Sequence, residues 1–171
     1  MRKTMEVAGA MMLALLYWVT YSALNGPESL PARIPTHFEI SGQPNAWGSS
    51  QILWLLPAIG TGLYLLMTVL GSIRFRNFSL PVQVTEANLS FIQDQTTIMV
   101  AWIKLEVLCL FNFLQWKIIS GARAEYIRLS PVVIPIFLTV IFTTAGWRLA
   151  TIIRGARSRL ESPDSINHIQ N

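Results

Sequence analysis

The chain has 171 residues, of which 52% are apolar and only 13% are charged, against about 25% charged residues in ordinary soluble domains. This composition is typical of an integral membrane protein. The net charge is +4, and the basic residues gather beside the ends of apolar runs, which indicates membrane topology and argues against a nucleic-acid partner. Cys109 is the only cysteine, so no disulfide can form within the chain.

Four apolar runs divide the chain, and each is long enough to cross a membrane. They cover residues 5–24, 52–73, 97–119 and 131–153. About 20 helical residues, each rising about 1.5 Å, span a hydrocarbon core of about 30 Å. The connections are too short to bury a soluble core. We therefore predict an all-α, polytopic membrane protein, with a four-helix bundle as a single membrane domain over residues 1–160 and a disordered cytoplasmic tail at 161–171.

The first run follows two basic residues, as a secretion signal would. It exceeds the usual signal core of about 7–15 residues, and Tyr21-Ser22-Ala23 is a poor cleavage site, so we expect a retained span. With the N-terminus inside, eight basic residues fall on the cytoplasmic side (Arg2, Lys3, Arg74, Arg76, Arg148, Arg154, Arg157 and Arg159) and four outside (Arg33, Lys117, Arg123 and Arg128). This excess predicts that both termini are cytoplasmic.

Local signals predict the shape of the second and third helices. Pro57 lies about two turns into the second run, where a proline removes a backbone hydrogen bond and bends a helix. Ala58 and Gly62 form a small-xxx-small pair, which predicts the close approach of another helix. From Thr85, which can cap a helix, nothing interrupts a helical pattern as far as Ile119. We expect the first three turns of that helix to project into the cytoplasm.

The polar residues of the third run are the candidates for chemistry inside the membrane. Lys104 and Glu106 are two positions apart, about 200° around a helix, so their side chains cannot pair directly. Lys104 is close enough to the cytoplasmic end to snorkel. Glu106 lies deeper, and it is either a hydrogen-bonded clasp between helices or a proton or cation relay. Asn112 and Gln115 suit interhelical hydrogen bonds.

Several kinds of site are absent from the sequence. His37 and His168 both lie outside the apolar runs, so haem cannot be held between two intramembrane histidines. The sequence has no glycine-rich phosphate loop, no paired-cysteine metal site, no HExxH helix and no nucleophile in a recognisable context. We therefore expect no cofactor, no catalytic or metal-binding residues and no enzymatic activity.

The first connection, residues 25–50, carries the most specific pattern. It holds four prolines and three glycines, which predict a stiff, defined path. Alternating polarity from Ile34 to Ile40 predicts a short strand with one apolar face. Gly42 to Asn45 would turn the chain, and Trp47 would return it to the membrane interface, where indoles are enriched.

The motif of this loop is Leu30-Pro31, Ile34-Pro35-Thr36-His37-Phe38, Gly42, Pro44 and Trp47-Gly48-Ser49. It resembles the signature of a bacterial membrane domain of unknown function, numbered 1648. That domain also forms the N-terminal part of the immunity proteins that protect sporulating bacilli from a secreted toxin. The resemblance covers roughly the first 70 residues, and it implies a polytopic helical fold in a bacterial plasma membrane.

For the immunity branch, the resemblance further implies toxin resistance and membrane sequestration of a transcriptional repressor. This chain has four spans rather than the longer architecture of that branch, with its second, C-terminal membrane domain. We therefore expect the resemblance to indicate the location of this chain better than its activity.

Eight loop residues form the candidate functional loop: Pro35, Thr36, His37, Phe38, Gly42, Pro44, Trp47 and Gly48. His37 either contacts an external ligand or partner, or closes the loop by bonding to loop carbonyls. One histidine with Glu39 beside it lacks the third and fourth ligands of a metal site.

Two functions remain open at this stage. The first is a non-enzymatic membrane protein that recognises a peptide, protein or envelope component through its outer loop and relays this to a cytoplasmic partner through residues 85–95. The second is a small proton-coupled transporter or permease component that uses Glu106 as its coupling carboxylate. The long structured loop favours the first, because compact four-span exporters usually have very short connections. Beyond the lipid bilayer, a second copy of the chain is a further partner that the sequence leaves open.

Overall fold

The computed structural model describes residues 2–39, 43–73, 80–124 and 132–160. Its elements are α1 (Arg2–Asn25), β1 (Arg33–Phe38), β2 (Pro44–Ser49), the 3₁₀ helix η1 (Ser50–Trp54), α2 (Leu55–Ser72), α3 (Glu86–Ala124) and α4 (Val133–Leu160). The predicted disordered tail, with His168, lies outside the described residues, as do Ile40 and Gly42 of the loop.

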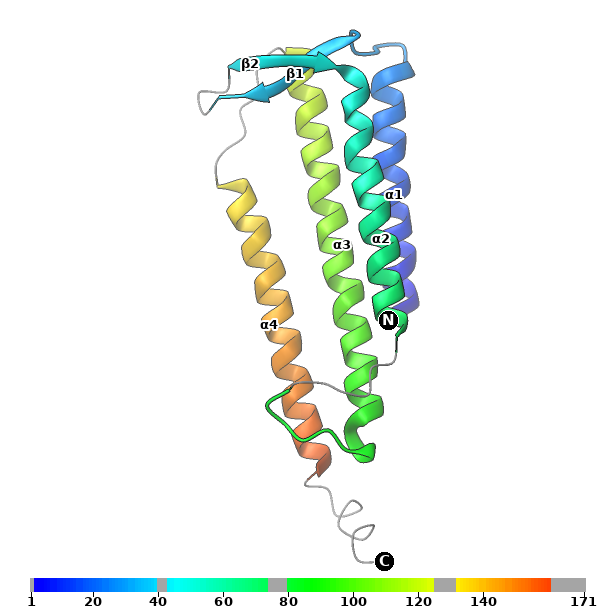
Figure 1. The fold of residues 1–171 in the computed structure, drawn as a ribbon, viewed down its shortest axis with the longest axis vertical. Helices are drawn as coiled ribbons and strands as arrows, with labels where there is room; N and C mark the ends of the chain where they lie inside the picture. The colour runs from blue at the N-terminus through cyan, green and yellow to red at the C-terminus, as the bar shows by residue number, and fades with distance from the viewer. Residues whose placement is uncertain (1, 40–42, 74–79, 125–131, 161–171) are drawn as a thin grey trace, which may run out of the picture.

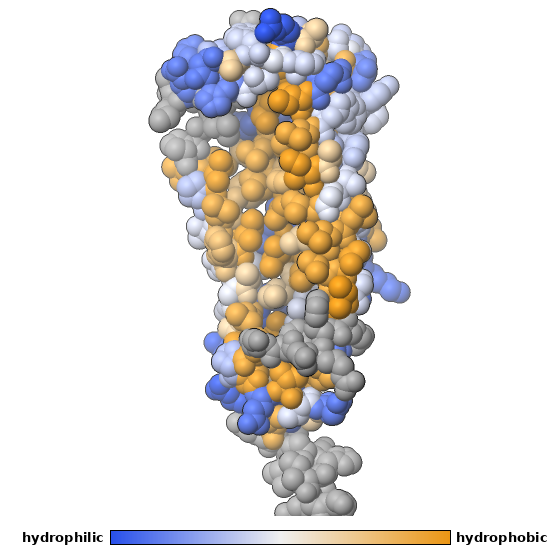
Figure 2. All heavy atoms as spheres, viewed as in Figure 1, coloured by the Kyte–Doolittle hydropathy of each residue, from blue (hydrophilic) through white to orange (hydrophobic). Residues whose placement is uncertain are grey.

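Four long helices lie side by side, and the β1–β2 sheet lies across one end of them (Figure 1). Within the described residues, four helices are long and apolar enough to cross a membrane. On the face drawn in Figure 2, apolar side chains cover the middle of the molecule, and hydrophilic side chains lie toward both ends. The predicted four-helix membrane fold is therefore confirmed, together with a structured connection between the first two helices.

Helix α3 is the central element of the bundle, since it packs against α1, α2 and α4. Its 39 residues extend for about 58 Å at 1.5 Å per residue, well beyond the thickness of a hydrocarbon core. Helix α4 leans against α3, on the side away from α1 (Figure 1). Much of α4 is left uncovered by the rest of the described chain, with Phe142 and Trp147 each 72% exposed, so we expect lipid to cover this surface.

The second helix differs from its prediction at two positions. Residues 50–54 form η1, and α2 begins only at Leu55, so Pro57 lies in the first turn of α2. Backbone N–H groups in a first turn have no partner within the helix, so proline removes no helical hydrogen bond there. Close packing occurs at Gly60, where a Cβ atom would lie 3.3 Å from Leu16, whereas Gly62 has open space around it. The predicted packing through Gly62 is wrong.

The beginning of α3 is held by Asn88 rather than by the hydroxyl of Thr85. Asn88 accepts a hydrogen bond from the Thr85 backbone N–H at 2.9 Å and donates to the carbonyl oxygen of Ala156 in α4 at 3.2 Å. Ile92 of α3 and Ile152 of α4 are buried in the same apolar cluster, where the two helices pack together. The first turns of α3 and the end of α4 therefore form a two-helix stalk.

The close contact within this stalk predicts the effect of adding one methyl group. A Cβ atom at Gly155 would lie 2.6 Å from Cε1 of Phe91, whose ring also carries the Arg159 guanidinium 3.7 Å away. We expect Gly155→Ala to lower the free energy of unfolding by about 1–3 kcal/mol, the scale of overpacking. Gly146→Ala is the matched control, because that position of the same helix is open. Melting in detergent measures both, and equal stability of the two variants would contradict the contact.

Candidate functional site

The loop between α1 and α2 forms a cap over one end of the bundle; we call the segment from Leu30 to Ser50 the outer cap. Its underside is apolar and closed. Ile34 is fully buried, and it belongs to a cluster with Leu30, Leu53 of η1 and Ile119 of α3. A backbone hydrogen bond from the Leu30 N–H to the Ala23 carbonyl (2.8 Å) ties the cap to α1, and another from the Ser50 N–H to the Ala32 carbonyl (3.0 Å) joins the two ends of the cap.

Two antiparallel strands form the cap, where the sequence had predicted one. Pro35 pairs with Trp47, and His37 pairs with Ala46, with a register shift between the two pairs. Ile34 and Pro35 are adjacent in β1 and both are buried, and the register shift follows directly after them, so the simple alternation that we had expected is broken. Residues 44 and 45 of the predicted turn belong to β2.

Several polar or aromatic side chains of the cap are exposed. Thr36, His37, Asn45 and Trp47 are all exposed. Nδ1 of His37 and Oδ1 of Asn45 lie 2.5 Å apart, and because the amide oxygen can only accept, we assign the proton to Nδ1. Of the two readings of His37, the loop-closing contact is present, but with a side-chain amide rather than with loop carbonyls.

The remaining motif residues have structural roles that the geometry explains. A Cβ atom at Gly48 would lie 2.8 Å from Cγ2 of Thr36, so only glycine fits opposite that threonine. Pro44 begins β2 and pairs with Phe38, at the edge position where a proline costs no ladder hydrogen bond. Gly42 lies outside the described residues, and nothing in the described part of the chain gathers three or more histidine, cysteine or acidic side chains around a metal position.

A second group of polar residues lies inside the bundle, around Lys104. The ammonium group of Lys104 forms an ion pair with Glu6 of α1 and donates a hydrogen bond to Oγ1 of Thr68 in α2, at 2.9 Å. It also lies 4.4 Å from the ring centroid of Tyr64, a cation–π distance. Lys104 is 1% exposed.

This arrangement corrects two predictions. Lys104 does not snorkel to water, because Glu6 neutralises its charge within the bundle. The sequence had also indicated ionisable residues only in the third span, and it missed Glu6. The available signal was an acidic residue at the beginning of the first apolar run, on the same predicted side of the membrane as Lys104.

Two further polar residues on the same face of α3 hold α1 and η1. Asn112 donates to the carbonyl oxygen of Met12 at 2.9 Å, which occupies a backbone acceptor of α1. Gln115 is fully buried and donates to Oγ1 of Thr20 at 2.7 Å and to the Leu53 carbonyl at 3.1 Å. Both residues form the interhelical hydrogen bonds that we expected of them.

Glu106 faces α4, on the other side of α3 from Lys104. Its Oε1 accepts a hydrogen bond from the Thr144 hydroxyl at 2.8 Å. Its Oε2 is buried and has no hydrogen-bond partner among the described residues. The contact with Thr144 matches the expected clasp, while the second oxygen leaves room for an additional donor.

One part of this chain matches a known protein family. Residues 10–61 match the family described as "Domain of unknown function (DUF1648)". The resemblance found in the loop motif is thereby confirmed. The DUF1648 segment contains most of α1, the whole outer cap and the beginning of α2. Comparisons with curated proteins and with solved structures produced no match.

The buried ion pair predicts strong coupling between α1 and α3. We expect Lys104→Met to lower the melting temperature in detergent, because it leaves the carboxylate of Glu6 without its cation. Glu6→Gln should also destabilise, and the double variant should lose less than the two single losses combined. Lys3→Met is the control, since Lys3 is exposed and should change stability by less than about 0.5 kcal/mol. Strictly additive losses would show that the two side chains do not interact.

The clasp at Glu106 predicts a different ranking of variants. Glu106→Gln retains a hydrogen-bond acceptor for Thr144 and should melt normally. Glu106→Leu should lower stability by about 0.6–2 kcal/mol, the scale of interhelical hydrogen bonds in membranes. Thr144→Val should lose about the same amount as Glu106→Leu, because it removes the donor of the same bond. A Gln variant as unstable as the Leu variant would contradict this interpretation.

Proposed function

We propose that this chain is a non-enzymatic bacterial plasma-membrane protein whose outer cap recognises a peptide, protein or envelope component. The observation that carries the proposal is the contrast between buried and exposed residues within the cap. Ile34 and Pro35 are buried beneath it, whereas His37, Asn45 and Trp47 are exposed on it. A fixed platform that presents an indole and paired polar groups loses little conformational entropy when it binds a partner.

The charge distribution supports an outward-facing cap. The beginning of α1 and the end of α4 lie at the end of the bundle away from the sheet (Figure 1), and the basic residues Arg154, Arg157 and Arg159 gather at the end of α4. The excess of basic residues near that end supports a cytoplasmic location for it by the positive-inside rule. The cap then faces the extracytoplasmic side, where a secreted peptide or an envelope component is accessible.

Toxin immunity is a narrower form of this proposal. The DUF1648 segment supplies the cap, and the immunity proteins that this segment resembles act on a secreted toxin. The stalk of α3 and α4 would offer the surface for a cytoplasmic partner. A second candidate function, proton-coupled transport, is favoured by one observation, the buried Oε2 of Glu106 without a partner among the described residues.

Photocrosslinking from the cap tests the main proposal. A photoreactive amino acid at Ala46, which is exposed beside Trp47, should crosslink an extracytoplasmic component in living cells. We expect Trp47→Ala to reduce that crosslink by about tenfold, the loss of about 1.4 kcal/mol that an aromatic contact can supply. Gln51→Ala, an exposed change beside the cap, should leave it unchanged.

Two outcomes would turn against recognition through the cap. Equal crosslinking in the Trp47→Ala and Gln51→Ala proteins would show that the captured component does not use the exposed side. Proton flux in vesicles that Glu106→Gln abolishes, in a protein that melts normally, would instead favour the transporter.

A further inference from the structure

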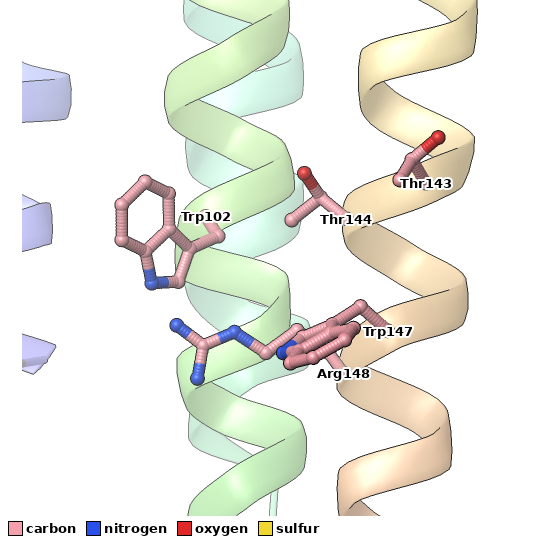
Figure 3. A pocket seen from close by; sticks show the side chains of 5 residues that line it. All are labelled: Trp102, Thr143, Thr144, Trp147 and Arg148. Atoms are coloured by element: carbon pink, nitrogen blue, oxygen red, sulfur yellow. The ribbon is translucent and has the colours of Figure 1, made fainter.

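A cleft between α3 and α4 is not used by the proposed function. It has a volume of about 410 Å³ and is lined by Trp102 of α3 and by Thr143, Thr144, Trp147 and Arg148 of α4 (Figure 3). Thr143 and Trp147 at its rim are exposed. In a membrane-spanning bundle, a cleft with an exposed rim at this position opens toward lipid rather than toward water.

The cleft contains a cation, Arg148, that has no anionic partner among the described residues. Arg148 is half-buried, and its guanidinium lies 5.5 Å from the ring of Trp102. Among the described residues, no carboxylate pairs with it. A guanidinium carries five N–H donors and no acceptor, and an ionised group held within a membrane requires a partner.

A second donor in the same place also lacks an acceptor. The indole Nε1 of Trp102 is buried and has no hydrogen-bond partner in the described part of the chain. Figure 3 shows the indole nitrogen and the guanidinium nitrogens of Arg148 close to each other on the same side of the cleft. The hydroxyl of Thr144 is already donated to Glu106. A single acceptor that carries negative charge would therefore satisfy both the guanidinium of Arg148 and the indole N–H of Trp102.

The depth of Arg148 identifies the source of that acceptor. The fifteen residues from Val133 to Trp147 cover about 22 Å of a hydrocarbon core of about 30 Å, at 1.5 Å per residue. Arg148 therefore lies within the leaflet on the side where α1 begins and α4 ends, and the length of an arginine side chain allows its guanidinium to meet a lipid phosphate drawn toward it. Basic pockets between transmembrane helices on this side suit anionic headgroups.

We propose that the α3–α4 cleft binds an anionic phospholipid, with its headgroup phosphate on Arg148 and Trp102. The phosphate oxygens accept hydrogen bonds from the guanidinium, which is suited to bidentate phosphate contacts, and from the indole N–H. The acyl chains lie along the uncovered apolar surface of α4, whose Phe142 and Leu138 are exposed. The lipid thereby fills the space beside the clasp of Glu106 and joins α4 to the rest of the bundle.

Lipid binding to the purified protein in detergent, measured by native mass spectrometry, tests this site. Dioleoyl-phosphatidylglycerol and dioleoyl-phosphatidylcholine have the same acyl chains and differ in headgroup charge. We expect the wild-type chain to bind the glycerol lipid about five- to tenfold more tightly, and Arg148→Gln to lose this preference. Trp102→Phe keeps an aromatic ring but removes the indole N–H, so it should bind the glycerol lipid about two- to threefold more weakly. Arg157→Gln, an exposed change on the same helix, should retain the full preference.

Further measurements distinguish a lipid site from a site for a free anion and from an ion pair with Glu106. Inorganic phosphate should not displace the lipid, and competition by it would indicate a site for a free anion instead. Arg148→Lys keeps the positive charge but lacks the planar guanidinium, so it should show an intermediate preference for the glycerol lipid. This variant tests the site even if Arg148→Gln fails to fold. Should Arg148 instead pair with the free oxygen of Glu106, neither lipid would be preferred, and Glu106→Gln and Arg148→Gln would destabilise the lipid-free protein equally. That result, or equal losses in the Arg148 and Arg157 variants, would overturn the proposal.

Discussion

The ion pair between Lys104 and Glu6 is the constraint on which the rest of the bundle depends. In hydrocarbon, helices gain no hydrophobic energy by associating, so close packing and polar contacts between them decide the arrangement. A buried ammonium must also be neutralised where it stands. Glu6 and Thr68 do so from two different helices, and this fixes the rotation of α3 relative to both α1 and α2.

The outer cap depends on the same rotation. Once Lys104 faces α1 and α2, Asn112 and Gln115 lie on the same face of α3, two and three turns nearer the cap. Gln115 then connects α3 to Thr20 of α1 and to the carbonyl of Leu53 in η1, directly beneath the apolar underside of the cap. The polar face of α3 therefore holds the helix ends that form the platform for His37 and Trp47. A change deep in the membrane should loosen the exposed surface at the other end.

Helix α4 is attached to the bundle differently from the other three helices. It is attached to α3 by the Glu106–Thr144 hydrogen bond near the middle and by the packed stalk below. It leaves a cleft beside Arg148 that other side chains of the described chain do not fill. The DUF1648 match ends at residue 61, so it contains the cap but neither α3 nor α4. The features that we assign to recognition and to lipid binding thus lie in different parts of the chain.

The sequence by itself determined the features that depend on local properties. Apolar length predicted the four spans, and the 100° rotation per helical residue placed Lys104 and Glu106 on opposite faces. The loop motif predicted a structured cap, and the DUF1648 match confirms its family resemblance. Only the tertiary structure decided which distant residues meet. Glu6 lies 98 positions from Lys104, and close packing falls at Gly60 instead of Gly62, because the rotation and register of packed helices depend on contacts with all their neighbours rather than on any local pattern.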